Sequence, residues 1–221
     1  MNKKRLTDKR FLLVALMFVF SSIVYSQKIA DFFMAMPDKL LPSLSKQHRF
    51  ELLEYSKLNR KDSLKNRFDS YVSGLYVDSV GQYIVMNTTK NHSFEMKLFI
   101  TGQNDTLIGV ISTIQKPFPL SVIRFYSTDW KITTAGFLPP ASSAWLKPSS
   151  SDDVNVDPEW VKKLLESSYL TFTFSKTADA IEVANHLTDF VNIEEKKQID
   201  SLLFDKVLVY KFDKNGFVLA E

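Results

Sequence analysis

Cysteine is absent from the 221-residue sequence, and glycine and proline are scarce, with 6 and 8 residues. Without cysteine the chain forms no disulfide, iron–sulfur cluster or thiolate zinc site, and it has no N-terminal cysteine to carry a lipid. The low glycine and proline content excludes a fibrous or low-complexity protein. The hydrophobic fraction of 45% excludes a disordered chain, because enough apolar surface can be buried to offset lost chain entropy.

Histidine is also scarce, and the motifs of common catalytic sites are missing. The three histidines, His48, His92 and His186, lie in unrelated segments. No Gly-x-Ser-x-Gly sequence marks a nucleophilic serine, and the glycines are too scattered for a phosphate-binding loop or a dinucleotide fingerprint. The sequence therefore predicts no catalytic residue and no cofactor, and it favours a protein that is not an enzyme.

One fragment has the spacing of a calcium-binding loop. Asp153, Asn155 and Asp157 match the first three ligand positions. Pro158 then stands where that loop needs glycine, and Leu164 where it needs glutamate. Because a helix cap explains Asp157 without a metal, we predict no metal site.

Residues 1–26 have the three parts of a cleavable export signal. Five basic residues precede the apolar run Phe11–Phe20, and Val24-Tyr25-Ser26 ends on a small residue. The run is shorter than the roughly 20 residues that span a membrane. We therefore predict cleavage after Ser26, no transmembrane anchor after cleavage, and a periplasmic or secreted protein.

Removing this signal changes the charge. The whole chain has 28 basic and 25 acidic residues, a formal charge of +3. Residues 1–26 hold five of the basic residues and one acidic residue, which leaves 23 and 24 and a formal charge of −1 for residues 27–221. Nucleic-acid binding needs a clustered positive surface, so the sequence predicts no nucleic-acid partner.

Helical patterns open the mature chain and strand patterns follow. The apolar segment 28–36 ends at Pro37, and Ser45 is a predicted N-cap for a helix reaching Leu58. From Tyr71 the hydrophobic period becomes two, with one face of each strand expected in the core. The predicted strands cover 71–77, 82–88, 94–100, 106–114 and 120–126. Their short connections predict an antiparallel meander.

The C-terminal part repeats this alternation. We expect helices starting at Asp157 and at Asn192, and strands at 169–174, 180–184, 206–212 and 217–219. The predicted fold class is α+β, an antiparallel sheet packed against N-terminal and C-terminal helices. Residues 27–221 are expected to form a single domain. Two lobes, 27–130 and 157–221, joined by the loop 131–156, are the alternative.

A cluster of aromatic and charged residues offers a candidate binding surface. Arg124, Tyr126 and Trp130 lie where a predicted strand ends, and Trp145 lies in the long loop. Aromatic side chains with a few polar neighbours hold sugars or peptides in many binding modules. A glycan or a peptide is therefore the candidate ligand, and packing at the edge of the core is the alternative role.

Several segments resemble one family of exported proteins. The motifs are Ala35-Met36-Pro37-Asp38, Leu40-Leu41-Pro42-x-Leu44, Ile111-Ser112-Thr113-Ile114, Pro119-x-Ser121 and Phe125-Tyr126-Ser127-Thr128-Asp129-Trp130. They resemble a group of Bacteroidales proteins catalogued as domain of unknown function 3256. The resemblance covers nearly the whole mature chain. It implies a periplasmic or secreted protein and no assigned activity, catalytic residue or cofactor.

Three hypotheses follow for the function. The first is a non-catalytic periplasmic module that binds a ligand or has a structural role. The second is a periplasmic hydrolase whose site is assembled only in three dimensions, joining a histidine to a carboxylate and a serine. The third is a component of an envelope assembly.

Overall fold

The computed structural model describes residues 28–58, 64–102, 105–147, 160, 163 and 169–220. The predicted export signal and the calcium-like fragment lie outside these residues. So does nearly all of the helix expected from Asp157. No helix among the described residues combines the length and the apolar character needed to cross a membrane.

Two helices and a short 3-10 turn form the N-terminal layer. They are α2 (Lys28–Ala35), η2 (Asp38–Leu40) and α3 (Lys46–Lys57). Ser45 caps α3 as predicted: its side chain accepts a hydrogen bond from the His48 backbone N–H, and the His48 side chain accepts one from the Ser45 backbone N–H. This reciprocal cap satisfies two backbone donors that a helix start leaves unpaired.

Seven antiparallel strands follow in chain order and form one large sheet. The predicted meander is confirmed, and each strand pairs with its neighbour in sequence. The strands are β1 (Leu64–Lys65), β2 (Tyr71–Asp78), β3 (Tyr83–Thr89), β4 (His92–Ile100), β5 (Thr106–Ile114), β6 (Leu120–Tyr126) and β7 (Ile132–Thr133).

A second, smaller sheet is formed by the C-terminal strands in the order β11-β10-β9-β8. Asn192 caps α5 through the backbone N–H groups of Glu194 and Glu195, as its sequence predicts. The elements are β8 (Leu170–Phe174), β9 (Ala180–Asn185), η4 (Leu187–Asp189), α5 (Ile193–Leu202), β10 (Leu208–Phe212) and β11 (Phe217–Leu219).

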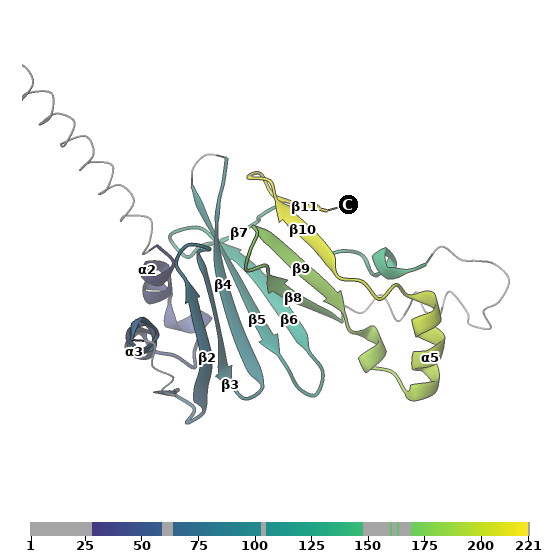
Figure 1. Ribbon diagram of the computed structural model, residues 1–221, viewed down its shortest axis with the longest axis horizontal. Helices are drawn as coiled ribbons and strands as arrows, with labels where there is room; N and C mark the ends of the chain where they lie inside the picture. The colour runs from purple at the N-terminus through teal and green to yellow at the C-terminus, as the bar shows by residue number, and fades with distance from the viewer. Residues whose placement is uncertain are drawn as a thin grey trace, which may run out of the picture.

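The large sheet lies between the N-terminal helices and the small sheet (Figure 1). One of its faces packs on α2 and α3 through residues such as Ile84, Met96 and Ile108. Its other face packs on the small sheet, where Phe99 contacts the rings of Phe174 and others. The α+β fold class is therefore confirmed, with two hydrophobic cores on opposite faces of one sheet.

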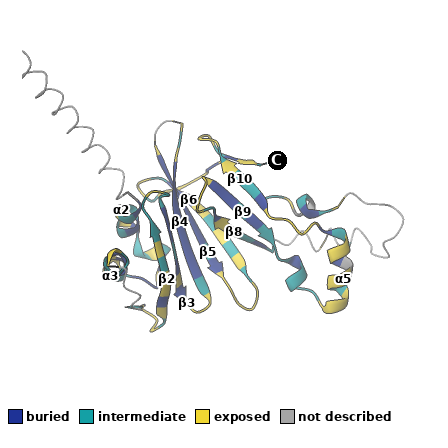
Figure 2. Cartoon of the chain, viewed as in Figure 1, coloured by how far each residue is buried: buried dark blue, intermediate teal, exposed yellow. Residues whose placement is uncertain are grey.

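The expectation that β4 buries only one face is wrong. Phe94, Met96 and Leu98 alternate with Glu95, Lys97 and Phe99, which predicts that the second set faces outward, yet those three residues are 6%, 1% and 0% exposed. Figure 2 shows β4 buried along most of its length. The cause is the small sheet, which covers this second face and whose position the alternation within β4 does not reveal.

Two buried charged residues tie the sheets together. Lys97 Nζ donates to the carbonyl oxygens of Ser175 and Ala178, at 2.8 and 2.7 Å. Glu95 Oε2 accepts from the Tyr83 hydroxyl at 2.9 Å and from the Phe174 backbone N–H at 3.0 Å. Burial lowers the pKa of Lys97 and raises the pKa of Glu95. These hydrogen bonds replace water for groups that would otherwise be costly to bury.

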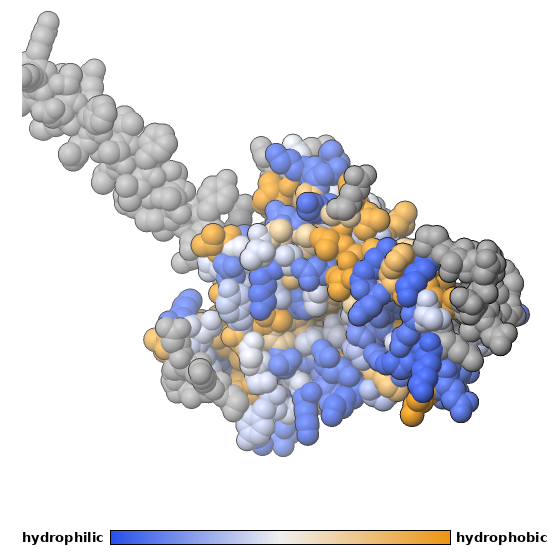
Figure 3. Space-filling model, turned by 45° about the vertical axis from the view of Figure 1, so that its right-hand side comes forward, coloured by the Kyte–Doolittle hydropathy of each residue, from blue (hydrophilic) through white to orange (hydrophobic). Residues whose placement is uncertain are grey.

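The start of the loop predicted at 131–156 packs on the core between the two sheets, which we call the second core. It contains β7 and η3 (Ser142–Trp145), and Phe137 packs edge-on against Phe172 and Phe217. Hydrophilic side chains cover much of the surface shown in Figure 3, and hydrophobic groups show in several smaller areas between them.

Candidate functional site

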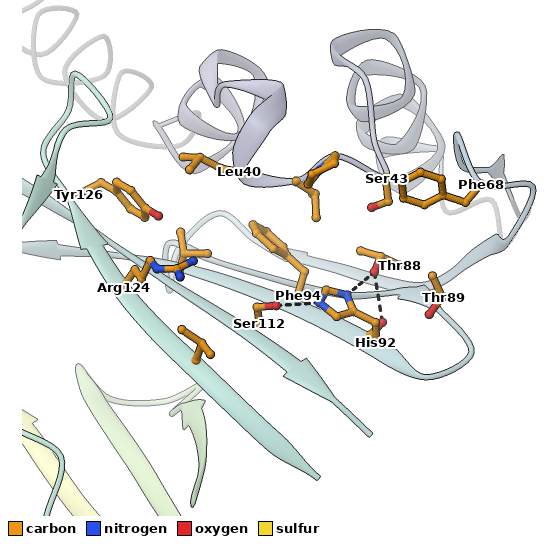
Figure 4. A pocket seen from close by; sticks show the side chains of 14 residues that line it. Leu40, Ser43, Phe68, Thr88, Thr89, His92, Phe94, Ser112, Arg124 and Tyr126 are labelled. Carbon is orange, nitrogen blue, oxygen red and sulfur yellow. Dashed lines mark hydrogen bonds between the residues drawn. The ribbon is translucent and has the colours of Figure 1, made fainter. Parts of the chain in front are cut away.

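A pocket of about 330 Å³ lies between the large sheet and the η2 segment, which we define as residues 36–45 joining α2 to α3. The η2 segment forms its roof, and β3 to β6 form its floor (Figure 4). This volume lies at the lower end of the range for small-molecule sites. The lining residues are Leu40, Leu41, Pro42, Ser43, Phe68, Thr88, Thr89, His92, Phe94, Val110, Ser112, Val122, Arg124 and Tyr126.

Strand register brings the floor residues together. Phe94 on β4 pairs with Ser112 on β5, which pairs with Val122 on β6. Two residues earlier on β5, Val110 pairs with Arg124. Because side chains two residues apart on a strand point to the same face, these five residues all face the helix layer.

A hydrogen-bonded chain of three side chains lies at one end of the pocket. His92 Nε2 lies 2.7 Å from Ser112 Oγ, and His92 Nδ1 lies 2.5 Å from Thr88 Oγ1. Burial lowers the pKa of His92 below its ordinary value of 6.5. The ring is therefore neutral at pH 7, with one nitrogen as donor and the other as acceptor.

Arg124 and Tyr126 lie at the opposite end of the pocket (Figure 4). Tyr126 is 5% exposed, and its ring lies 5.6 Å from the ring of Trp130. Arg124 is exposed and points its guanidinium group into the pocket. The lining contains no aspartate or glutamate, so the pocket itself supplies no negative charge to Arg124.

A buried arginine holds the roof in place. Arg49 on α3 is 1% exposed and donates to the carbonyl oxygens of Met36 and Leu44, at 2.6 and 3.0 Å. It also donates to Asp38 at 3.1 Å, and Arg67 donates to the other carboxylate oxygen. Partial desolvation opposes the effect, but these two guanidinium groups lower the pKa of Asp38. Both ends of the η2 segment are therefore tied to one side chain.

The structure brings three of the four predicted surface residues together. Arg124 and Tyr126 line the pocket, and the ring of Trp130 packs at a tilt against the ring of Tyr126. Trp145 lies elsewhere: it is 1% exposed in the second core, and its Nε1 donates to the Lys206 carbonyl at 2.9 Å. Trp145 has the packing role that was the alternative, because η3 places it against the segment 203–206 between α5 and β10.

The other two histidines have local partners. His48 belongs to the α3 cap. His186 Nδ1 lies 3.0 Å from Asp189 Oδ2, and its Nε2 lies 2.9 Å from Thr171 Oγ1, but none of these three residues lines the pocket. Within the described ranges, no three histidine, aspartate or glutamate side chains are placed to hold a metal ion.

Thr88, His92 and Ser112 are pocket residues that sequence reasoning did not select. Thr88 and Ser112 lie on predicted strands and His92 lies two residues before one, and their places on β3, β4 and β5 come from the pairing register. The available signal was the phase of each strand: Ser112 shares its phase with the apolar Ile108 and Val110. A polar residue at a core phase is a reason to look for a site.

Comparison with known proteins places the chain in a family and a fold. The family described as "Protein of unknown function (DUF3256)" matches residues 21–217. A solved domain of an uncharacterized protein from Porphyromonas gingivalis W83 has a similar fold, with a TM-score of 0.72 and 21% identity. The match covers 86% of this chain and 96% of that one. No curated protein matches the sequence.

Proposed function

The chain belongs to the DUF3256 family of proteins of unknown function, and we propose that it is an exported, non-catalytic binding module whose ligand site is the pocket under the η2 segment. One observation carries the proposal. Apolar walls and a few converging polar groups surround a concave space, as they do in small-molecule sites. Arg124, Tyr126 and Ser112 supply the polar groups.

A screen with one blocking variant tests the binding site. Val122 lines the pocket and is 51% exposed, so Val122→Trp narrows the pocket without entering the core. Leu120 lies on the same strand and face but outside the lining, and Leu120→Trp is the matched control. Residues 27–221 are screened by thermal shift against glycans, peptides and small organic anions. The proposal predicts a ligand whose effect is lost in Val122→Trp and kept in Leu120→Trp.

Two outcomes contradict this assignment. A ligand that stabilises wild type and both variants equally binds outside the pocket. A screen in which no compound distinguishes Val122→Trp from Leu120→Trp also rejects the pocket as the ligand site. Each variant is first checked for an unchanged melting temperature without ligand, so that misfolding is not mistaken for lost binding.

Export is supported by the sequence of residues 1–26, with their basic start, apolar run and small residue at Ser26. The test is N-terminal sequencing of the protein recovered from cell fractions. The proposal predicts a mature chain that begins at Gln27 and is recovered with the periplasm or the medium. A chain that begins at Met1 and remains with the cytoplasm or the inner membrane contradicts export.

A periplasmic hydrolase is the second candidate, and the Ser112–His92 contact of 2.7 Å favours it. Ser112 Oγ would attack an ester carbonyl while His92 Nε2 takes its proton, and the alcohol would leave with that proton. Water would then release the acid and restore the serine. Two features weigh against this candidate: His92 Nδ1 meets the Thr88 hydroxyl rather than a carboxylate, and Ser112 lies within a paired strand.

Hydrolysis has a direct test. Wild type and Ser112→Ala are compared for cleavage of p-nitrophenyl esters and for labelling by a fluorophosphonate. The binding proposal predicts no labelling of either protein and equal background cleavage. Labelling of Ser112 in wild type, with loss of cleavage in Ser112→Ala, would establish the hydrolase instead.

A further inference from the structure

We infer that the pocket under the η2 segment binds a small amphipathic anion: one negatively charged group at Arg124 and an apolar body against the sheet. This inference rests on the proposed binding function and names the class of its ligand.

The guanidinium group of Arg124 is the first feature that indicates an anionic ligand. Among the described residues, the three acids on segments next to the pocket are already engaged. Asp38 is held by Arg49 and Arg67, Asp69 lies 2.7 Å from Lys65, and Asp129 lies 3.4 Å from Lys131. Arg124 points into a lining that contains no carboxylate. A guanidinium group presents a planar set of donors that matches a carboxylate or a similar anion.

The apolar walls are the second feature, and they indicate that the ligand has an apolar body. Phe94 and Val110 are 1% and 7% exposed and form the centre of the floor, and Leu40 and Leu41 face them from the roof. Replacing water with apolar atoms at such a surface lowers the free energy. A ligand that is polar along its whole length, such as an oligosaccharide, would leave hydroxyl groups against these walls without partners.

The state of His92 limits the ligand to a single charge. Its pKa is lowered by burial, so the ring adds no second positive charge at neutral pH. Its two nitrogens are already bonded to Ser112 and Thr88. A phosphate dianion would therefore meet one cation only. The hydroxyl of Ser112 can form one further hydrogen bond, as donor or as acceptor, with a polar atom in the body of the ligand.

Octanoate is the probe that separates these contributions. Its matched controls are octanol, which lacks the charge, acetate, which lacks the apolar body, and octylamine, which reverses the charge. Binding to residues 27–221 is measured by calorimetry below the micelle concentration. We expect octanoate to bind at least about tenfold more tightly than octanol, which is about 1.4 kcal/mol, and the other two controls to bind more weakly still.

Two variants locate the charge. Arg124→Met keeps an unbranched apolar stem and removes the charge, and substitutions at exposed residues such as Arg124 usually change stability by no more than about 0.5 kcal/mol. Lys211→Met removes one charge from an exposed residue of β10 in the small sheet, outside the pocket lining. Arg124→Met should abolish the preference for octanoate over octanol, whereas Lys211→Met should leave it unchanged.

The outcomes separate this inference from the proposed function. If octanoate does not bind, or if the preference survives in Arg124→Met, the amphipathic anion is rejected. The binding function still stands in that case if a screened ligand loses its effect in Val122→Trp and keeps it in Leu120→Trp. If no ligand of any class distinguishes these two tryptophan variants, the binding function itself is rejected.

Discussion

Replacing Arg49 with methionine tests how the roof of the pocket is held. Arg49 donates to the buried carbonyl oxygens of Met36 and Leu44 and to the carboxylate of Asp38. Arg49→Met keeps most of the side-chain volume, so the change removes hydrogen bonds rather than opening a large cavity. It leaves two carbonyl oxygens without a donor at both ends of the η2 segment.

The expected loss follows from these contacts. Each carbonyl left unpaired in the interior costs about 1–3 kcal/mol. The lost contact with Asp38 adds little, because that carboxylate is 41% exposed and keeps Arg67 as a partner. Methionine also avoids the cost of burying a guanidinium group, which offsets part of the loss. We expect the free energy of unfolding to fall by about 3 kcal/mol, a large share of the 5–15 kcal/mol typical of a domain.

Urea denaturation at pH 7 measures this difference, and Arg67→Met is its matched control. Arg67 binds the same Asp38 but is 43% exposed, so its loss should cost about 1 kcal/mol or less. The reasoning is refuted if Arg49→Met changes stability by less than about 1 kcal/mol, or if the two variants lose the same amount. Arg49→Met should also weaken ligand binding, because the roof residues 40–43 lose their anchor.

Three further changes test the packing and the electrostatics. Gly109→Ala would place a Cβ 2.6 Å from Phe174 Cζ and 3.0 Å from Phe99 Cε2, so we expect a loss of about 1–3 kcal/mol in urea denaturation, and an unchanged midpoint would contradict the packing between the sheets. Lys97→Met removes the donor to the carbonyl oxygens of Ser175 and Ala178; the Ala178 oxygen keeps the Ala180 backbone N–H, so one unpaired carbonyl should cost about 1–2 kcal/mol by the same assay. A stabilised variant would show that burying the charge costs more than its hydrogen bonds return. The pKa of His92 is lowered in the folded protein, so the unfolded chain binds a proton more readily. The contribution of neutral His92 to stability is therefore present above the ordinary pKa of 6.5 and is lost as pH falls through the folded pKa. His92→Asn should flatten this part of the stability–pH curve, and an unchanged slope would contradict the assignment.

Local signals in the sequence predict most of the elements. Ser45 and Asn192 are both helix caps in the structure, and β5 and β6 have the predicted bounds. These features depend on neighbouring residues, so they can be read from one sequence. The two-residue strands β1 and β7 were not predicted, because so short a segment has no measurable period.

Features that depend on distant contacts were harder to predict. The burial of Glu95 and Lys97 comes from the small sheet, about 80 residues further along the chain, to which they bond at Phe174 and Ser175. Arg124 and Tyr126 were recognised as site candidates because aromatic and charged residues cluster where their strand ends. His92 joins them only through the pairing of β3 to β6, and no local pattern specifies that register.

Methyl chemical shifts measured during an octanoate titration test the central claim, that the pocket under the η2 segment is the ligand site. Leu40, Leu41, Val110 and Val122 supply methyl groups in the pocket, and Leu219 on β11 is the distant control. The account predicts saturable shifts confined to the pocket methyls, and their loss in Arg124→Met. Shifts that are absent, or that are as large at Leu219 as in the pocket, would contradict it.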